Sequence, residues 1–287
     1  MELRRYHDVD DYLRVATPFL VQREAEHNLI FGVAGTYRED PGQYTGPAYL
    51  ATVLDADRVV AVALRTPPYR LVLSEADDPA AIGLIARDTL EFDLPGVQGP
   101  VEVVQAFARE REARGGPPAH RALGERVYRL TTVVPPRPVA GFMRMPNPSD
   151  RDVIADWTHA FMVEAIGEDD RPGAEVAADR WIAGRGRSLY VWETDGELVS
   201  LAGVTGPTPN GIRVGPVYTP PEQRGRGYAS ALVAAVSQAQ LDSGRAFVFL
   251  FTDLANPTSN RIYQAIGYEA VRDIDVYDYE GVEPSPS

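Results

Sequence analysis

The sequence predicts an α/β fold with a mixed sheet, arranged in two domains. Its 287 residues reach the size, about 250 to 300 residues, at which a single hydrophobic core stops growing. A proline-rich stretch at 134–138 can continue neither a central strand nor a helix, so it predicts a linker. Strand and helix patterns alternate after this stretch. The predicted division is an N-terminal domain at 1–134, a linker at 135–138, a second domain at 139–279 and a disordered tail at 280–287.

The second domain has the pattern of one α/β unit. Asp195-Gly196 joins two apolar segments, which is typical of a tight hairpin. Pro216 lacks the N–H that a sheet hydrogen bond needs, so its strand should be bulged or splayed there. Predicted strands occupy 139–146, 188–194, 198–204, 211–219 and 246–251, and predicted helices occupy 149–164 and 174–184 and begin again at Tyr228 and Asn256.

The first domain repeats this order of elements, which predicts a degenerate copy of the same fold. After its fourth strand, Glu75, Asp77 and Asp78 supply three negative charges, so an anion would be repelled there. We therefore expect one competent site, in the second domain. The predicted strands are 2–6, 49–55, 59–65, 69–73 and 126–134, and the predicted helical segments are 8–33, 79–91 and 101–114.

The run Arg-Gly-Arg-Gly-Tyr-Ala at 224–229 lies where a chain can form a cradle for a diphosphate. Gly225 and Gly227 can adopt positive φ and lack a Cβ, so the backbone can approach an anion closely. Tyr228 begins an apolar stripe with helical spacing, and the first amides and the dipole of that helix favour a phosphate. Arg224 and Arg226 add charge-assisted donors. Most short glycine runs are simple turns, so a turn is the alternative to this interpretation.

The composition argues against several other classes of site. The chain has no lysine, which the nucleotide triphosphate loop requires, and its glycines lack dinucleotide spacing. It has no cysteine, and its four histidines lack metal-ligand spacing, so we expect no metal site. A net charge of −13 argues against nucleic acid as a partner. Since no membrane span or signal peptide is indicated, we expect a cytoplasmic protein without a membrane partner.

The glycine run resembles the pyrophosphate loop of the GCN5-related N-acetyltransferases (GNAT), written Gln/Arg-x-x-Gly-x-Gly/Ala. A second segment supports the resemblance, because Asn256 follows the next apolar strand and Tyr263 comes seven positions later, as in that family. The resemblance implies an acetyl-CoA N-acyltransferase fold, here in a tandem arrangement. It also implies acetyl-CoA as co-substrate and an amine as acceptor.

The resemblance implies a role for each matching residue. Tyr263 would be the catalytic general acid beside the CoA sulfur. Relatives often carry a glutamate on the fourth strand, but 213–218 contains no acidic residue, so the base is unassigned. Glu164, Asp169, Asp170 and Glu193 are weak candidates for it. The residues that would bind the cofactor are Val217, Tyr218, Thr219, Arg224, Gly225, Arg226, Gly227, Tyr228, Ala229, Asn256 and Ser259.

Two functions follow from these residues. The first is acetyl transfer to an amine by direct attack in a ternary complex, because no nucleophile for an acyl-enzyme is evident. The amine could belong to a small molecule, a peptide or a protein, and the enzyme could be a monomer or a homodimer. The alternative is a non-catalytic sensor or scaffold that binds acyl-CoA.

Overall fold

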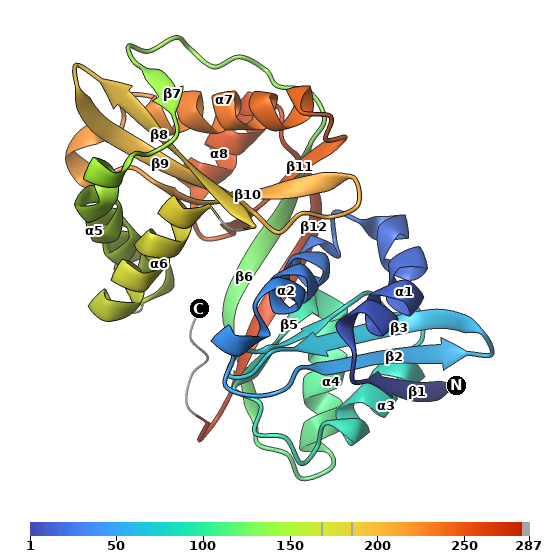
Figure 1. Cartoon of the computed structure of the whole chain (residues 1–287). Coiled ribbons are helices and arrows are strands. Elements are labelled where there is room, and N and C mark those ends of the chain that lie inside the picture. Colours follow the sequence, from blue (N-terminus) through green and yellow to red (C-terminus); the bar gives the residue numbers. More distant parts are fainter. Residues whose placement is uncertain (168, 185, 283–287) are drawn as a thin grey trace. The chain divides into compact units, whose positions relative to one another are not determined.

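The structure is a computed structural model that describes residues 1–167, 169–184 and 186–282 (Figure 1). The chain forms two compact units that exchange short segments. Unit 1 contains Met1–Val127, Thr252–Ala255 and the described residues from Val271 onward, and unit 2 contains Tyr128–Phe251 and Asn256–Ala270. The predicted division into domains at 1–134 and 139–279 with a linker at 135–138 stays a prediction. The predicted tail, 280–287, lies outside the described residues from position 283 onward.

Unit 1 is a mixed sheet covered by helices on both faces. Its strand order is β1-β2-β3-β4-β5-β12-β6. The β4–β5 pair is parallel, whereas the pairs β1–β2, β2–β3, β3–β4 and β5–β12 are antiparallel. Its helices are α1 (Val9–Leu20), α2 (Asn28–Glu39), α3 (Pro79–Asp88) and α4 (Val101–Glu112). Its strands are β1 (Glu2–Tyr6), β2 (Tyr49–Asp55), β3 (Arg58–Arg65), β4 (Leu71–Leu73), β5 (Gly96–Pro100), β6 (Ala119–Leu130) and β12 (Glu269–Tyr279).

Alternation along the strands of unit 1 produces two separate cores, since successive side chains of a strand point to opposite faces. Ala63 and Leu73 lie in a core with residues of α3 and α4. Their neighbours Leu64 and Val72 lie in the other core, with residues of α1 and α2. The sheet is therefore buried on both sides, which explains why β2 and β3 are almost continuously apolar.

Unit 2 repeats this plan, with the strand order β6-β11-β10-β9-β8-β7. Strands β7 to β10 pair antiparallel, and β10 pairs with β11 in parallel. The helices are α5 (Arg151–Phe161), a π-helix η4 (Met162–Ile166), α6 (Arg171–Ala183), α7 (Tyr228–Asp242) and α8 (Pro257–Ile266). The strands are β7 (Phe142–Arg144), β8 (Arg187–Thr194), β9 (Glu197–Thr205), β10 (Gly211–Tyr218) and β11 (Phe247–Asp253).

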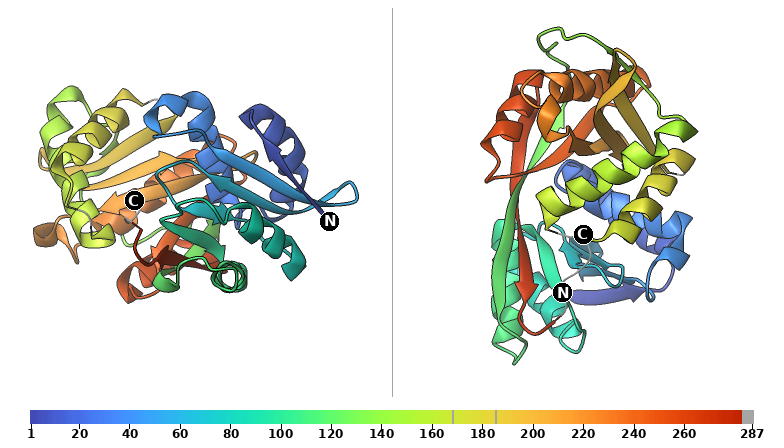
Figure 2. Two further views of the ribbon diagram at one scale, coloured as in Figure 1. Left: turned by 90° about the horizontal axis from the view of Figure 1, so that it is seen from below. Right: turned by 90° about the vertical axis from the view of Figure 1, so that its left-hand side faces the viewer.

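Helices cover both faces of the sheet in unit 2 as well (Figure 2). Leu189 and Leu201 lie in a core with residues of α5 and α6. Ala202 and Val214 lie in the opposite core, with residues of α7 and α8. The predicted mixed α/β architecture is thus confirmed, and both halves carry the same order of helices and strands.

Strand β6 departs from its predicted place. We predicted a strand at 126–134, whereas the structure has β6 at Ala119–Leu130. Tyr128 and Leu130, from the end of this strand, are fully buried in the core of unit 2. The Tyr128 hydroxyl donates to Asn260 Oδ1 at 2.9 Å and accepts from Gln264 Nε2 at 3.1 Å, and both partners lie on α8. A segment N-terminal to the predicted linker therefore fixes the position of α8.

Some helix boundaries also differ from the prediction. The predicted start at Ser149 is replaced by a short 3-10 turn, Pro148–Asp150, which precedes α5. Asn147 and Asp150 form a reciprocal capping box there, so two free backbone donors are satisfied before the α-helix begins. Helix α6 begins earlier than predicted, because the Asp170 side chain accepts from the Gly173 amide at 3.0 Å.

Candidate functional site

Strand β10 separates from its parallel neighbour in the middle of unit 2. It pairs with β11 over Gly211–Arg213, and among the described residues its later part pairs only with β9. The register with β9 shifts between Val214 and Val217, where the Gly215-Pro216 peptide is cis. The predicted bulge and splay at Pro216 are confirmed. Backbone groups near the end of β10 are thereby freed from pairing with β11.

The glycine loop follows this separated strand and leads into α7. Gly225 has a φ of 75° and Gly227 a φ of 90°, so both have the left-handed conformation that favours glycine. A Cβ on Gly225 would meet no atom within 4 Å, which means that the backbone there faces open space. Gly227 is the N-cap of α7, and no side chain caps the first amides of this helix. Residues 224–227 are all exposed.

The two arginines of the loop have different surroundings. The Arg224 guanidinium donates through Nε to the Thr219 carbonyl at 2.9 Å and through Nη2 to Glu164 Oε2 at 2.5 Å. It also lies over the Tyr218 ring, 5.7 Å from its centroid. Arg226 is exposed, and within the described chain it has no hydrogen-bond or ion-pair partner. Arg226 is therefore available to an anion, whereas Arg224 is already paired with a carboxylate.

The predicted residues at the end of β10 point to both faces of the sheet. Tyr218 is buried against α5 and α6, and Val217 packs partly against the core on the α7 side. The Tyr218 hydroxyl donates to Glu164 Oε1 at 3.0 Å. Burial, and then this hydrogen bond, raise the pKa of Tyr218. The Thr219 hydroxyl is hydrogen-bonded to the Ser200 hydroxyl at 2.8 Å.

Helix α8 begins as the sequence predicts. Asn256 is its N-cap, with Pro257 in the first turn, and the Asn256 side chain accepts from the Ser259 amide at 3.0 Å. This contact gives Asn256 and Ser259 a structural role at the helix start. Because β10 and β11 are parallel, the loops after them, which lead into α7 and α8, lie at the same edge of the sheet.

Tyr263 lies on α8 and packs against the same core cluster as Val217 and Tyr228. Its ring meets Tyr268 edge-on, with centroids 6.0 Å apart. No hydrogen-bond partner for its hydroxyl is found among the described residues. Burial raises the pKa of Tyr263 to about 12, so the phenol is protonated at neutral pH.

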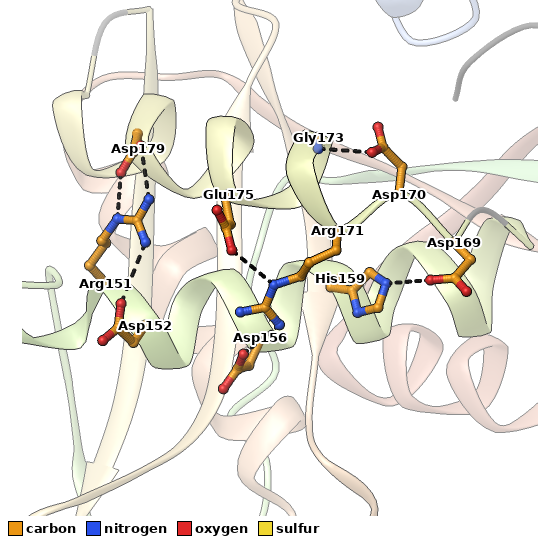
Figure 3. A network of polar contacts seen from close by, with 10 residues as sticks. All are labelled: Arg151, Asp152, Asp156, His159, Asp169, Asp170, Arg171, Gly173, Glu175 and Asp179. Carbon is orange, nitrogen blue, oxygen red and sulfur yellow. Dashed lines mark hydrogen bonds and ion pairs between the residues drawn. The ribbon is translucent and has the colours of Figure 1, made fainter.

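The four weak candidates for the general base have different hydrogen-bond and ion-pair partners. Asp169 accepts from or pairs with His159 Nε2 at 2.8 Å, and Asp170 caps α6 (Figure 3). Glu193 accepts from Arg144 Nε at 2.5 Å. Glu164, on the π-helix, is the one of the four that contacts both β10 and the glycine loop. Its place next to the loop is not evident from the sequence, because a π-helix has no readable residue pattern.

The corresponding junction of unit 1 is closed. The Glu75 carboxylate is buried and pairs with Arg272 at 3.0 Å and Arg23 at 3.4 Å. The Glu75 amide donates to the buried His27 ring at 3.3 Å. Asp78 caps the first turn of α3 through the Ala80 amide, so a carboxylate occupies the position that an anion would take.

The strands of unit 1 also stay together at this junction. Strand β4 pairs with β5 in parallel over Leu71 and Val72. A Cβ on Gly99 of β5 would lie 2.7 Å from the Leu73 carbonyl oxygen, so the two backbones remain close to the end of β4. The splay that separates β10 from β11 has no counterpart there.

None of the described helices is long and apolar enough to cross a membrane. Within the part of the chain that the structure describes, no cluster of three histidine, aspartate or glutamate side chains could hold a metal ion.

Among known protein families, residues 153–268 match the model described as acetyltransferase (GNAT) family. This range contains the separated strand, the glycine loop and α8. No curated protein is significantly similar to the chain.

Solved structures resemble the fold over almost the whole chain. A Drosophila protein is 14% identical, covering 96% of this chain and 98% of its own, with a TM-score of 0.67. A GCN5-related N-acetyltransferase from Sphaerobacter thermophilus is 19% identical, covering 100% and 97%, with a TM-score of 0.58. A tandem GNAT protein from the clavulanic acid biosynthesis pathway is 16% identical, covering 99% of both chains, with a TM-score of 0.56. These likenesses show the fold, including its tandem arrangement.

Proposed function

We propose that the protein transfers the acetyl group of acetyl-CoA to an amine, since residues 153–268 match the acetyltransferase (GNAT) family model. The observation that carries this proposal is the open glycine loop at the start of α7, placed directly after a strand that separates from its neighbour. Acetyl transfer in general is what the family model implies. The roles of individual residues are our proposal.

The residues of the loop fit a diphosphate in charge and in shape. The uncapped amides at the start of α7, the space in front of Gly225 and the exposed Arg226 all favour an anion. In our proposal the diphosphate is held by Arg224, Gly225, Arg226, Gly227, Tyr228 and Ala229.

The rest of the cofactor would follow the sheet. The backbone of Val217, Tyr218 and Thr219 would pair with the amides of the pantetheine arm, because this part of β10 pairs with β9 on one side and, among the described residues, does not pair with β11 on the other. Asn256 and Ser259 would line the opposite side, at the start of α8. The cofactor would supply an activated thioester carbonyl to this gap.

The acceptor must lose a proton before it can attack. A primary ammonium group has a pKa near 10.4, so deprotonation at pH 7 costs about 4 to 5 kcal/mol. As its nitrogen bonds to the carbonyl carbon, the carbon–sulfur bond breaks, one proton is released to solvent and one ends on the sulfur. The carboxylate or water that takes the first proton is unassigned.

Tyr263 would assist the departure of the sulfur. Its pKa of about 12 is well above that of a thiol, near 8.5, so complete proton transfer to a thiolate would be unfavourable. Tyr263 would therefore act mainly by donating a hydrogen bond as negative charge develops on the sulfur. A fixed donor in a buried site stabilises such charge more than water does.

Turnover with a panel of amines tests the proposal. Free thiol should appear when acetyl-CoA and a suitable amine are both present, and Arg226→Gln should raise the KM for acetyl-CoA about tenfold with little change in kcat. Arg14→Gln is the matched control, since Arg14 is an exposed arginine of unit 1. Binding of acetyl-CoA without thiol release from any amine would favour the non-catalytic alternative.

A further inference from the structure

Glu164 is the acidic residue that contacts the proposed cofactor loop most directly. Its Oε2 atom accepts from Arg224 Nη2 at 2.5 Å, and its Oε1 atom accepts from the Tyr218 hydroxyl at 3.0 Å. Arg224 Nε meanwhile donates to the Thr219 carbonyl at 2.9 Å. One carboxylate thus joins the π-helix η4, the end of β10 and the first residue of the glycine loop.

This arrangement places a negative charge where an anionic ligand needs positive charge. A guanidinium paired with a carboxylate has little net charge to offer, and the carboxylate repels an incoming diphosphate. The pair is half-exposed, with 47% of the Arg224 side chain and 42% of the Glu164 side chain accessible to solvent. Exposed ion pairs are weak, so a ligand with more than one charge can displace this one.

We propose that Glu164 is a positioning residue that holds Arg224 until acyl-CoA binds, and that the diphosphate replaces Glu164 as the partner of Arg224. This inference rests on the proposed function of the same site. Its consequence is that Glu164 weakens cofactor binding through Arg224, although it lies next to the site. A merely structural role for Glu164 would have the opposite effect, because its loss would then loosen the loop.

Calorimetric titration of the full-length protein with acetyl-CoA tests the exchange. Glu164→Gln removes the charge but keeps an oxygen that can accept from the Tyr218 hydroxyl. We expect this variant to bind acetyl-CoA about 2- to 5-fold more tightly than the unmodified protein, the range expected for loss of an exposed ion pair. Arg224→Gln should bind more weakly, and adding Glu164→Gln to it should improve the affinity by less than the same substitution does in the unmodified protein, because only the direct repulsion by the carboxylate is then relieved.

Glu175→Gln is the matched control for the change in net charge. Glu175 pairs with Arg171 on α6, and the exposed fractions of these side chains, 45% and 46%, are almost those of the Glu164–Arg224 pair (Figure 3). This control should bind acetyl-CoA with unchanged affinity. Weaker or equal binding by Glu164→Gln, or an equal gain in the Arg224→Gln background, would overturn the inference. If the unmodified protein itself fails to bind acetyl-CoA, the proposed function fails instead.

Discussion

Burial controls the protonation of two residues that matter for this account, Tyr263 in unit 2 and His27 in unit 1. The Tyr263 phenol is kept neutral because its surroundings disfavour the charged form, with a pKa of about 12. The His27 imidazole is kept neutral for the same reason, and its pKa is lowered to about 4. One of these groups bears on chemistry and the other on stability.

Tyr263→Phe tests the chemical role. Loss of the hydroxyl should lower kcat about 10- to 100-fold, as expected for removal of one donor to a developing charge, while the KM for acetyl-CoA changes little. The phenylalanine ring keeps the packing on the core, so thermal unfolding should shift only slightly. Steady-state kinetics with thiol detection measure both constants, and an unchanged kcat would assign Tyr263 to packing alone.

The raised pKa of Tyr263 also predicts a pH profile. Between pH 7 and about 10 the phenol stays protonated, so the rate should rise throughout this range as more of the amine, with a pKa near 10.4, becomes deprotonated. A fall in kcat near pH 10 that is absent from Tyr263→Phe would show that Tyr263 ionises at its ordinary pKa.

His27 should make the stability of unit 1 depend on pH. Its Nδ1 lies 3.0 Å from the Leu20 carbonyl and its Nε2 accepts from the Glu75 amide, so the fold requires the neutral ring. Because the folded pKa is about 4, below the ordinary value of 6.5, this stabilisation is present above pH 6.5 and is lost as the pH falls toward 4. The loss should be about 2 to 3 kcal/mol.

Urea unfolding between pH 7 and pH 4, followed by circular dichroism, measures this effect. His27→Gln should be less stable than the unmodified protein at pH 7, and the difference should shrink at pH 4. His7→Gln, at an exposed position, should follow the unmodified protein at every pH. If the free energies of unfolding of His27→Gln and the unmodified protein differ by the same amount at every pH, the pKa of His27 does not change between the folded and unfolded states.

At the scale of elements, the glycine loop is defined by backbone conformation rather than by side chains. A Cβ on Gly227 would lie 3.0 Å from the Val139 Cγ1 atom, and the positive φ of Gly227 disfavours any side chain there as well. A Cβ on Gly225 would contact no atom within 4 Å, so a side chain there would be disfavoured only by the positive φ of the backbone. We expect Gly227→Ala to lower the free energy of unfolding by about 1 to 2 kcal/mol, and Gly225→Ala by about 1 kcal/mol. Thermal denaturation of the two variants provides the comparison, and equal stability of both with the unmodified protein would contradict the observed loop geometry.

Most elements could be predicted from the sequence, because their patterns are local. The Asp195-Gly196 hairpin and the Asn256 cap depend on neighbouring residues only. Strand β5 was not predicted, because its Gly-Val-Gln-Gly-Pro sequence has a single β-branched residue, Val97, among two glycines and a proline, which are depleted in strands. Strand β12 was not predicted either, since its alternating charged residues serve distant partners, such as Asp278 for Arg70.

The candidate site was predicted only in part, for a similar reason. The glycine loop and Tyr263 lie within readable motifs, so the sequence alone suggests them as site residues. The contact between Glu164 and Arg224 joins residues 60 positions apart, and a sequence pattern cannot reveal it. Tyr128, which fixes α8, lies even farther from its partners and before the predicted linker.

Across the whole chain, two copies of one fold differ at the junction that leads into α7 in unit 2 and into α3 in unit 1. In unit 2 the loop before α7 is exposed, carries two arginines and follows a separated strand. In unit 1 the junction before α3 is acidic, capped by Asp78 and closed by the β4–β5 pairing. We therefore expect that only unit 2 binds the cofactor.

The number of acetyl-CoA molecules bound by each chain tests this requirement most directly. Isothermal titration of the full-length protein should give one site per chain, and combined Arg224→Gln and Arg226→Gln substitutions should weaken that site strongly without changing the thermal stability of unit 1. Absence of any binding, or two equivalent sites that persist in the doubly substituted protein, would contradict the central claim that the loop before α7 holds the diphosphate.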